Sequence, residues 1–120
     1  MRLLHGTTRV RAEEIIRVGP NPRFRERGGA GWNDGFSMTL EDGPFPFGKP
    51  EDYAVGKAME FPDEGGPVIL VVDVPEEIVD QAANEWFPLE QGLVQFDVGA
   101  GLEELMDAWA NLFKEIRSVT

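Results

Sequence analysis

The sequence predicts a small α+β domain, because strand-like and helix-like segments alternate along a chain long enough to bury one hydrophobic core. The chain has 120 residues, a size at which a single domain folds without disulfide or metal staples. The run Val68–Val72 is continuously apolar and β-branched, which is typical of a buried strand. Apolar residues at helical spacing follow Leu102. We expect one domain over residues 1–120 with about four strands.

The first quarter of the chain predicts a strand followed by a helix. Arg2–His5 has the pattern of a short strand, and Gly6–Thr8 offers the residues of a turn and a helix cap. Arg9–Val18 carries apolar residues at helical spacing, and Gly19 with Pro20 is a stop signal. We therefore expect a short amphipathic helix over Arg9–Val18.

The second quarter predicts a long loop, a strand and a second helix. Residues 20–34 have no periodicity and surround a glycine cluster, which predicts a surface loop. Gly35–Leu40 alternates, with Phe36, Met38 and Leu40 on one side. Residues 41–49 are irregular. Pro50 with acidic residues behind it is a helix start.

The second half predicts two more strands and two more helices. Pro67–Val74 has the pattern of the central strand, covered on both faces. Pro75–Ala83 begins like a helix, and Gly92–Val98 alternates as a strand does. The strongest helical stripe runs from Leu102 to Ile116 and predicts a C-terminal amphipathic helix that contributes to the core. Its members are Leu102, Leu105, Met106, Trp109, Leu112, Phe113 and Ile116.

Charge and cysteine content exclude several classes of function. The chain carries 22 acidic and 11 basic residues, a net charge of -11, so its field repels nucleic-acid phosphate and anionic lipid. The absence of cysteine rules out a disulfide framework, a thiol nucleophile and a cysteine zinc site. No apolar run reaches the ~18 residues of a membrane span, and the N-terminal apolar run is too short for a signal peptide. We expect a cytoplasmic protein with no membrane or nucleic-acid partner.

Two residue types occur once each and focus the search for a site. His5, the single histidine, ends the first predicted strand beside Gly6, a residue whose backbone is open to close approach. Tyr53, the single tyrosine, lies in the first turn of the second predicted helix. Taken alone, His5 and Tyr53 each fit an ordinary structural role.

Taken in order, these pieces resemble the ADP-ribosyltransferase superfamily. Its members carry a His-Gly-Ser/Thr step on the first strand, then a Gly-x-Tyr strand, then a helix bearing a second tyrosine, and finally an acidic strand. Here the corresponding segments are Leu4–Thr7, Gly35–Thr39 and Asp52–Ala54. The resemblance implies a split β-sheet core with flanking short helices and a C-terminal amphipathic helix.

The resemblance also implies NAD as the substrate and cleavage of its bond between nicotinamide and ribose. His5 would hydrogen-bond a ribose hydroxyl, the backbone of Gly6 would hold the nicotinamide amide, and Tyr53 would stack on the nicotinamide ring. The NAD-binding residues implied in this way are His5, Gly6, Thr7, Ser37 and Tyr53. The acceptor of ADP-ribose is not identified by the sequence, although a protein would fit.

The resemblance requires an acidic residue near the sugar, and several positions compete for that role. Positive charge develops on the ribose as nicotinamide leaves, so a carboxylate at the 2′-hydroxyl stabilises the transition state. Gln95 and Asp97 are two apart on a strand, share a face, and resemble the Gln/Glu-x-Glu pair of the transferase branch. Glu90, in the preceding loop, is the rival, and Glu85 is a weaker third.

Two positions depart from the family pattern and keep a second interpretation open. Ser37 stands where one branch has its first stacking tyrosine, and Pro50 stands where that branch often has a serine. The arginines of residues 23–27 would meet the NAD pyrophosphate if the site is active. The alternative function is a non-enzymatic module on the same fold, an acidic protein that binds or inhibits a partner.

Overall fold

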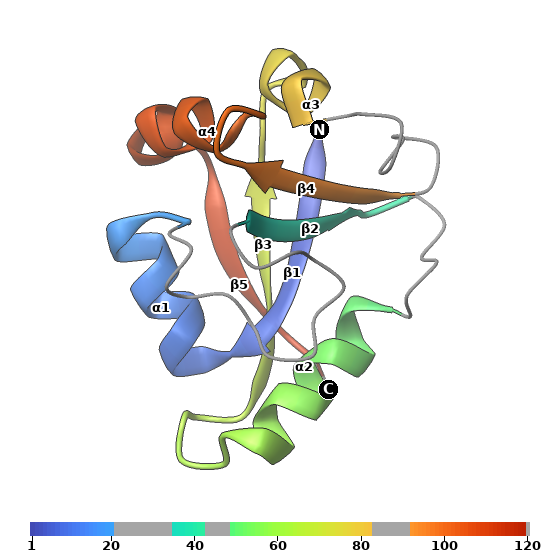
Figure 1. Cartoon of the computed structure of the whole chain (residues 1–120). Coiled ribbons are helices and arrows are strands. Elements are labelled where there is room, and N and C mark those ends of the chain that lie inside the picture. Colours follow the sequence, from blue (N-terminus) through green and yellow to red (C-terminus); the bar gives the residue numbers. More distant parts are fainter. Residues whose placement is uncertain (21–34, 43–48, 83–91, 120) are drawn as a thin grey trace.

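Five antiparallel strands form one sheet in the order β4-β2-β1-β3-β5. The structure is a computed structural model and describes residues 1–20, 35–42, 49–82 and 92–119 (Figure 1). The strands are β1 (Arg2–Thr8), β2 (Gly35–Leu40), β3 (Pro67–Asp73), β4 (Leu93–Asp97) and β5 (Lys114–Ser118). The helices are α1 (Arg9–Val18), α2 (Pro50–Glu60), α3 (Glu76–Ala82) and α4 (Leu102–Ala108), followed by a 3-10 turn over Trp109–Asn111. The α+β class is confirmed.

The strand β1 is the middle of the sheet and is longer than expected. It pairs with β3 from Arg2 to Thr8. The turn expected at Gly6–Thr8 is therefore wrong: opposite the β-branched and apolar residues of β3, these positions extend the strand. The expectation that Pro67–Val74 is the central strand is also corrected, because β3 lies one place to the side of β1.

The pairing of β1 with β2 is short. Leu3 lies opposite Leu40 and Leu4 lies opposite Thr39, and these are the pairs that join the two strands in the described residues. Figure 1 shows β2 and β4 running across the direction of β1, β3 and β5. The sheet therefore bends between β1 and β2, just beyond Leu4.

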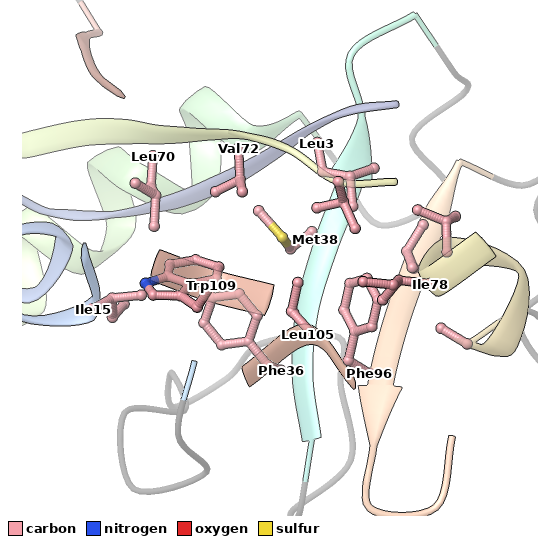
Figure 2. Close-up of a cluster of buried hydrophobic side chains, with 14 of the residues drawn as sticks. Leu3, Ile15, Phe36, Met38, Leu70, Val72, Ile78, Phe96, Leu105 and Trp109 are labelled. Carbon is pink, nitrogen blue, oxygen red and sulfur yellow. The ribbon is translucent and has the colours of Figure 1, made fainter. Parts of the chain in front are cut away.

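One face of the sheet, here called the core face, carries the main hydrophobic core. Side chains from both strand groups converge there with Ile15 of α1, Leu105 of α4 and Trp109 (Figure 2). The indole Nε1 of Trp109 donates a hydrogen bond to the carbonyl of Ile16 at 3.1 Å, so the buried ring keeps its polar group satisfied. The strand residues of this core are Leu3, Phe36, Met38, Val68, Leu70, Val72, Val94 and Phe96.

The opposite face, here called the α2 face, is covered by α2 over β1 and β3. Leu4, Ile69 and Val71 form a second buried cluster with Ala54 of α2. The strand β3 is thus apolar on both faces, as its continuous Val/Ile/Leu run predicts. The helix begins at Pro50, with Glu51 and Asp52 in its first turn, as expected from its start signal.

The C-terminal helix expected over Leu102–Ile116 is wrong beyond Ala108. The helix α4 ends there, a 3-10 turn follows, and Lys114–Ser118 forms β5 against β3. Trp109 ends the helix by inserting into the core, and the Nζ of Lys114 donates a hydrogen bond to the Trp109 carbonyl. Burial at this position lowers the pKa of Lys114. The described residues therefore form five strands, one more than the four or so expected.

The expected strand over Gly92–Val98 is confirmed in its centre but ends at Asp97. Val94 and Phe96 point to the core face, as the alternation predicts. Val98, expected beside them, lies outside the strand and is 68% exposed. A turn begins at this point, and the amide of Ala100 donates a hydrogen bond to the carbonyl of Asp97 at 2.9 Å.

The start of α1 is held by the segment between α2 and β3. The amides of Arg9 and Val10 donate hydrogen bonds to the carbonyls of Gly66 at 3.1 Å and Glu64 at 3.0 Å. One carboxylate oxygen of Glu64 accepts from the hydroxyl of Thr8 at 2.7 Å and from the guanidinium of Arg11 at 2.8 Å. Distant groups therefore supply the N-terminal hydrogen bonds of α1.

No helix in the described segments has the length and apolar character needed to cross a membrane.

Candidate functional site

Three adjacent strands bring together residues that are far apart in the sequence. The sheet order places β4, β2 and β1 side by side. Ser37 lies opposite Gln95, and Gly35 lies opposite Asp97. Because side chains alternate along a strand, and Phe36 and Met38 point to the core face, Ser37 and its neighbours Gln95 and Asp97 point to the α2 face.

A chain of hydrogen bonds links these polar side chains. The hydroxyl of Ser37 donates to Oε1 of Gln95. The amide Nε2 of Gln95 donates to Oδ1 of Asp97 at 2.9 Å. Gln95 is fully buried, and the opposite ends of its amide are occupied by these two partners. The Gln95 side chain is therefore fixed in one orientation, and it holds one oxygen of the Asp97 carboxylate.

His5 joins the same network from β1, at the point where β1 and β2 no longer pair through their backbones. Its Nδ1 lies 2.8 Å from the carbonyl oxygen of Ser37. Because a carbonyl can only accept, Nδ1 carries the hydrogen. The ring stacks on Phe36, with 4.5 Å between the ring centroids, and the residue is 8% exposed. The orientation of the imidazole and the position of its proton are both fixed.

Gly6 is the point where α2 meets β1. A Cβ built at Gly6 would lie 2.3 Å from the carbonyl oxygen of Pro50, 2.9 Å from the amide nitrogen of Ala54 and 3.2 Å from the Cβ of Tyr53. The first two distances are shorter than real Cβ contacts, and the third is tighter than most of them. A glycine is therefore required for the first turn of α2 to approach β1 this closely.

Tyr53 lies over β1 as a consequence of that close approach. Its Cβ is next to Gly6, the residue that follows His5, and the side chain is half-buried. Burial raises the pKa of Tyr53, so the phenol stays protonated at neutral pH. Tyr53 and Gly6 share the α2 face with Ser37 and Asp97.

The candidate residues differ in how much of their surface is open. Thr7 and Gln95 are fully buried, whereas Asp97 and Tyr53 are half-buried. Pro50 is buried at the first position of α2, and its carbonyl packs on Gly6. Of the residues implied by the resemblance, Ser37, Tyr53 and Asp97 are those with side chains both polar and partly exposed on this face.

Some of the predicted residues lie outside the described part of the chain. These are Glu90 and its weaker rival Glu85, together with the arginine-bearing stretch of residues 23–27. Among the described residues, no group of three His, Asp or Glu side chains is arranged to hold a metal ion.

The sequence analysis did not single out Phe36, which supports the histidine ring. Its apolar position in the strand Gly35–Leu40 identifies it as a core residue, and that assignment is correct. Its contact with His5 follows from the bend between β1 and β2, which brings Phe36 alongside a strand that it does not pair with. No signal in the sequence indicates that contact.

Comparison of this chain with protein-family models, with curated proteins and with solved structures found no match.

Proposed function

We propose that this chain binds NAD on the α2 face, beside the point where β1 and β2 cease to pair beyond Leu4, and cleaves the bond between nicotinamide and ribose. The products would be those of a mono-ADP-ribosyltransferase or of an NAD glycohydrolase. The observation that supports this most directly is the hydrogen-bonded series from His5 through Ser37 and Gln95 to Asp97. It joins the residues of three separate motifs that the resemblance treats as one site.

In this proposal Asp97 supplies the negative charge that the reaction needs. The bond between the nicotinamide nitrogen and the ribose carbon breaks, and its electron pair leaves with nicotinamide. A hydroxyl of water or of an acceptor then forms the new bond to that carbon and releases its proton. A carboxylate beside the sugar stabilises the positive charge that develops in between. Asp97 suits this role because its carboxylate is half-buried and oriented by Gln95.

Gln95 and Ser37 act as positioning residues in this proposal. Gln95 is fully buried, so it acts through Asp97 and does not contact the substrate itself. Ser37 holds the other end of the same amide through its hydroxyl and holds His5 through its carbonyl. The serine that replaces a stacking tyrosine of the family therefore has a defined part in this arrangement.

Tyr53 would contact NAD on the β1 side of the site, where its half-buried ring suits stacking on nicotinamide. The side chain of His5 lies on the same side of β1 as Leu3, stacks on Phe36 and is buried, so it points to the core face. In place of the expected bond to a ribose hydroxyl, its part would be to hold the backbone of Ser37. Gly6 lets the helix that carries Tyr53 approach β1. Thr7 is fully buried, so its part would be to hold β1 in place.

The direct test measures nicotinamide release from NAD and NAD binding on the same samples. Release is followed by chromatography, and binding by NMR titration of backbone amides up to millimolar NAD. We expect amides of β1, β2 and the first turn of α2 to shift, and nicotinamide to accumulate. No binding at millimolar NAD would refute the proposal.

Matched variants separate the roles of the residues. Asp97→Asn should lower nicotinamide release about 100-fold or more while NAD binding changes little, because the carboxylate acts mainly in the transition state. His5→Ala should weaken NAD binding. Asp80→Asn, an exposed acid on α3, is the control and should leave both measurements unchanged. Equal release by Asp97→Asn and Asp80→Asn would exclude Asp97 as the catalytic acid.

A second candidate function is favoured by the charge of α3 and α4. Neither helix contains a lysine or arginine, and their acidic residues are Glu76, Glu77, Asp80, Glu103, Glu104 and Asp107. This surface suits a non-enzymatic protein that binds a basic partner. Salt-sensitive binding to such a partner, unchanged by His5→Ala and Tyr53→Ala, would favour this function over NAD cleavage.

A further inference from the structure

The strand β5 forms an edge of the sheet in the part of the chain that the structure describes. It pairs with β3 on one side. The amide of Asp73 donates a hydrogen bond to the carbonyl of Phe113 at 3.1 Å, so the backbone of Phe113 points toward β3. Backbone groups alternate in direction along an antiparallel strand. The N–H and C=O of Lys114 and Ile116 therefore point to the outer side of β5.

The side chains of β5 alternate in charge around Ile116. Glu115 and Arg117 lie on the α2 face, on either side of Ile116, and both are more than 40% exposed. Within one chain Arg117 approaches Glu41 at 3.3 Å and Glu115 at 3.5 Å. Phe113, which precedes the strand, is 51% exposed.

This pattern is self-complementary for antiparallel pairing centred on Ile116. In that register Glu115 of each copy lies opposite Arg117 of the other, and Phe113 lies opposite Val119. The Glu115 and Arg117 positions form non-hydrogen-bonded pairs, in which the facing side chains are closest. The outward N–H and C=O groups of the two Ile116 residues bond to each other.

Other registers lack this complementarity. A shift of two residues in one direction places Glu115 opposite Glu115, and a shift in the other direction places Arg117 opposite Arg117. Parallel pairing also places like charges together. Charges on an edge strand usually prevent pairing, but here they disfavour the wrong registers and favour one.

We propose that β5 is a homodimer interface, in which two copies of this chain pair antiparallel around Ile116 and join their sheets into one. The partner is a second copy because the charge order of β5 complements itself. The interface is isologous, with the two-fold axis passing between the two Ile116 residues. It is independent of the NAD proposal, since none of its residues belongs to the candidate site.

The first test is the molar mass of the purified chain at increasing concentration, by sedimentation or light scattering. We expect a monomer–dimer equilibrium that reaches mostly dimer by about 0.5 mM, as for a small interface of modest affinity. A strictly monomeric chain at that concentration would overturn the proposal.

Charge reversal tests the register. Glu115→Arg and Arg117→Glu each place like charges opposite one another twice per dimer, so each should raise the dimer Kd about tenfold or more. Glu13→Arg, an exposed change on α1, is the control and should dimerise like the unmodified chain. Circular dichroism checks that each variant is folded.

Mixing the two variants provides the decisive measurement. A Glu115→Arg chain carries arginine at both positions and an Arg117→Glu chain carries glutamate at both, so the two should form a heterodimer more readily than either self-associates. The double variant E115R/R117E should regain self-association. If the mixture shows no more dimer than the separate variants, the proposed register is wrong.

Discussion

The two sides of β1 are built from different interactions. On the β3 side, pairing runs from Arg2 to Thr8 and the facing strand is apolar on both faces. On the β2 side, backbone pairing covers Leu3 and Leu4. Beyond them, the contact between the strands includes the hydrogen bond from the His5 ring to the carbonyl of Ser37. We call these the β3 flank and the β2 flank.

The two flanks of β1 differ in what their interactions contribute to the fold. Burial of apolar surface is non-directional and supplies most of the stability. Buried hydrogen bonds contribute little net stability but fix orientation, because an unsatisfied partner is costly. The β3 flank therefore stabilises the fold, and the β2 flank orients side chains for the proposed chemistry.

The largest expected effect is on the β3 flank. Leu70 is fully buried in the main core (Figure 2). Leu70→Ala should lower the free energy of unfolding by about 3–4 kcal/mol, through lost burial and the cavity left behind. Urea denaturation measures this change. A loss below about 1 kcal/mol would mean that the core relaxes around the cavity and that the flanks differ less than we infer.

The second effect lies at the boundary between the flanks. Gly6→Ala places a Cβ 2.3 Å from the carbonyl oxygen of Pro50. The first turn of α2 must then move, which we expect to cost about 2–3 kcal/mol. The same movement displaces Tyr53, so NAD binding should weaken even where the variant remains folded.

The matched control is Gly56→Ala in the same helix. A Cβ at Gly56 meets nothing within 4 Å, and alanine is the better helix former. Gly56→Ala should therefore raise the free energy of unfolding by about 0.5–1 kcal/mol. If both glycine variants changed stability alike, the close approach of α2 to Gly6 would not be the cause.

The third effect isolates the β2 flank. Ser37→Ala removes the donor to the buried Oε1 of Gln95, which should cost about 1–2 kcal/mol. Nicotinamide release should fall further than this stability loss accounts for, because Gln95 no longer holds Asp97 in one orientation. A variant that loses stability but keeps full activity would assign the network a structural role alone.

The smallest effect comes from an exposed ion pair at one end of the β3 flank. The guanidinium of Arg2 donates to the carboxylate of Asp73 at 3.0 Å, and this hydrogen bond lowers the pKa of Asp73. A lowered folded-state pKa stabilises the fold above the ordinary value of about 4. That contribution is lost as the pH falls through the lower, folded-state pKa.

Asp73→Asn measures this contribution. The variant should be slightly less stable than the unmodified chain at pH 7, and the difference should shrink as the pH falls below the ordinary aspartate pKa of about 4. Thermal unfolding over a series of pH values from 7 downward tests the expectation. A difference that persists at low pH would show that asparagine changes packing and not charge.

Local patterns predicted most of the elements and failed at the C-terminus for a physical reason. The spacing from Leu102 to Ile116 fits a helix, and Lys114–Ser118 contains a single apolar residue, Ile116, so no alternation marks it as a strand. Residues 114–118 form a strand because they pair with the edge of β3. Such a tertiary contact is not encoded in the local pattern.

The sequence analysis named the residues of the candidate site but did not predict which of them contact one another. The sequence analysis singled out His5, Ser37, Gln95 and Asp97 from short motifs. Their connection depends on the order β4-β2-β1 and on the register that sets Ser37 opposite Gln95. Order and register arise from long-range pairing, so neither follows from any single segment.

The segment that holds the start of α1 links that helix to a later part of the chain. The amides of Arg9 and Val10 bond to carbonyls of Glu64 and Gly66, and Thr8 makes no capping bond with its own helix. In hydrogen exchange these amides should therefore open together with the approach to β3, and not by local fraying of α1. During synthesis, the first helix of the chain would be completed only after more than half of the sequence has emerged.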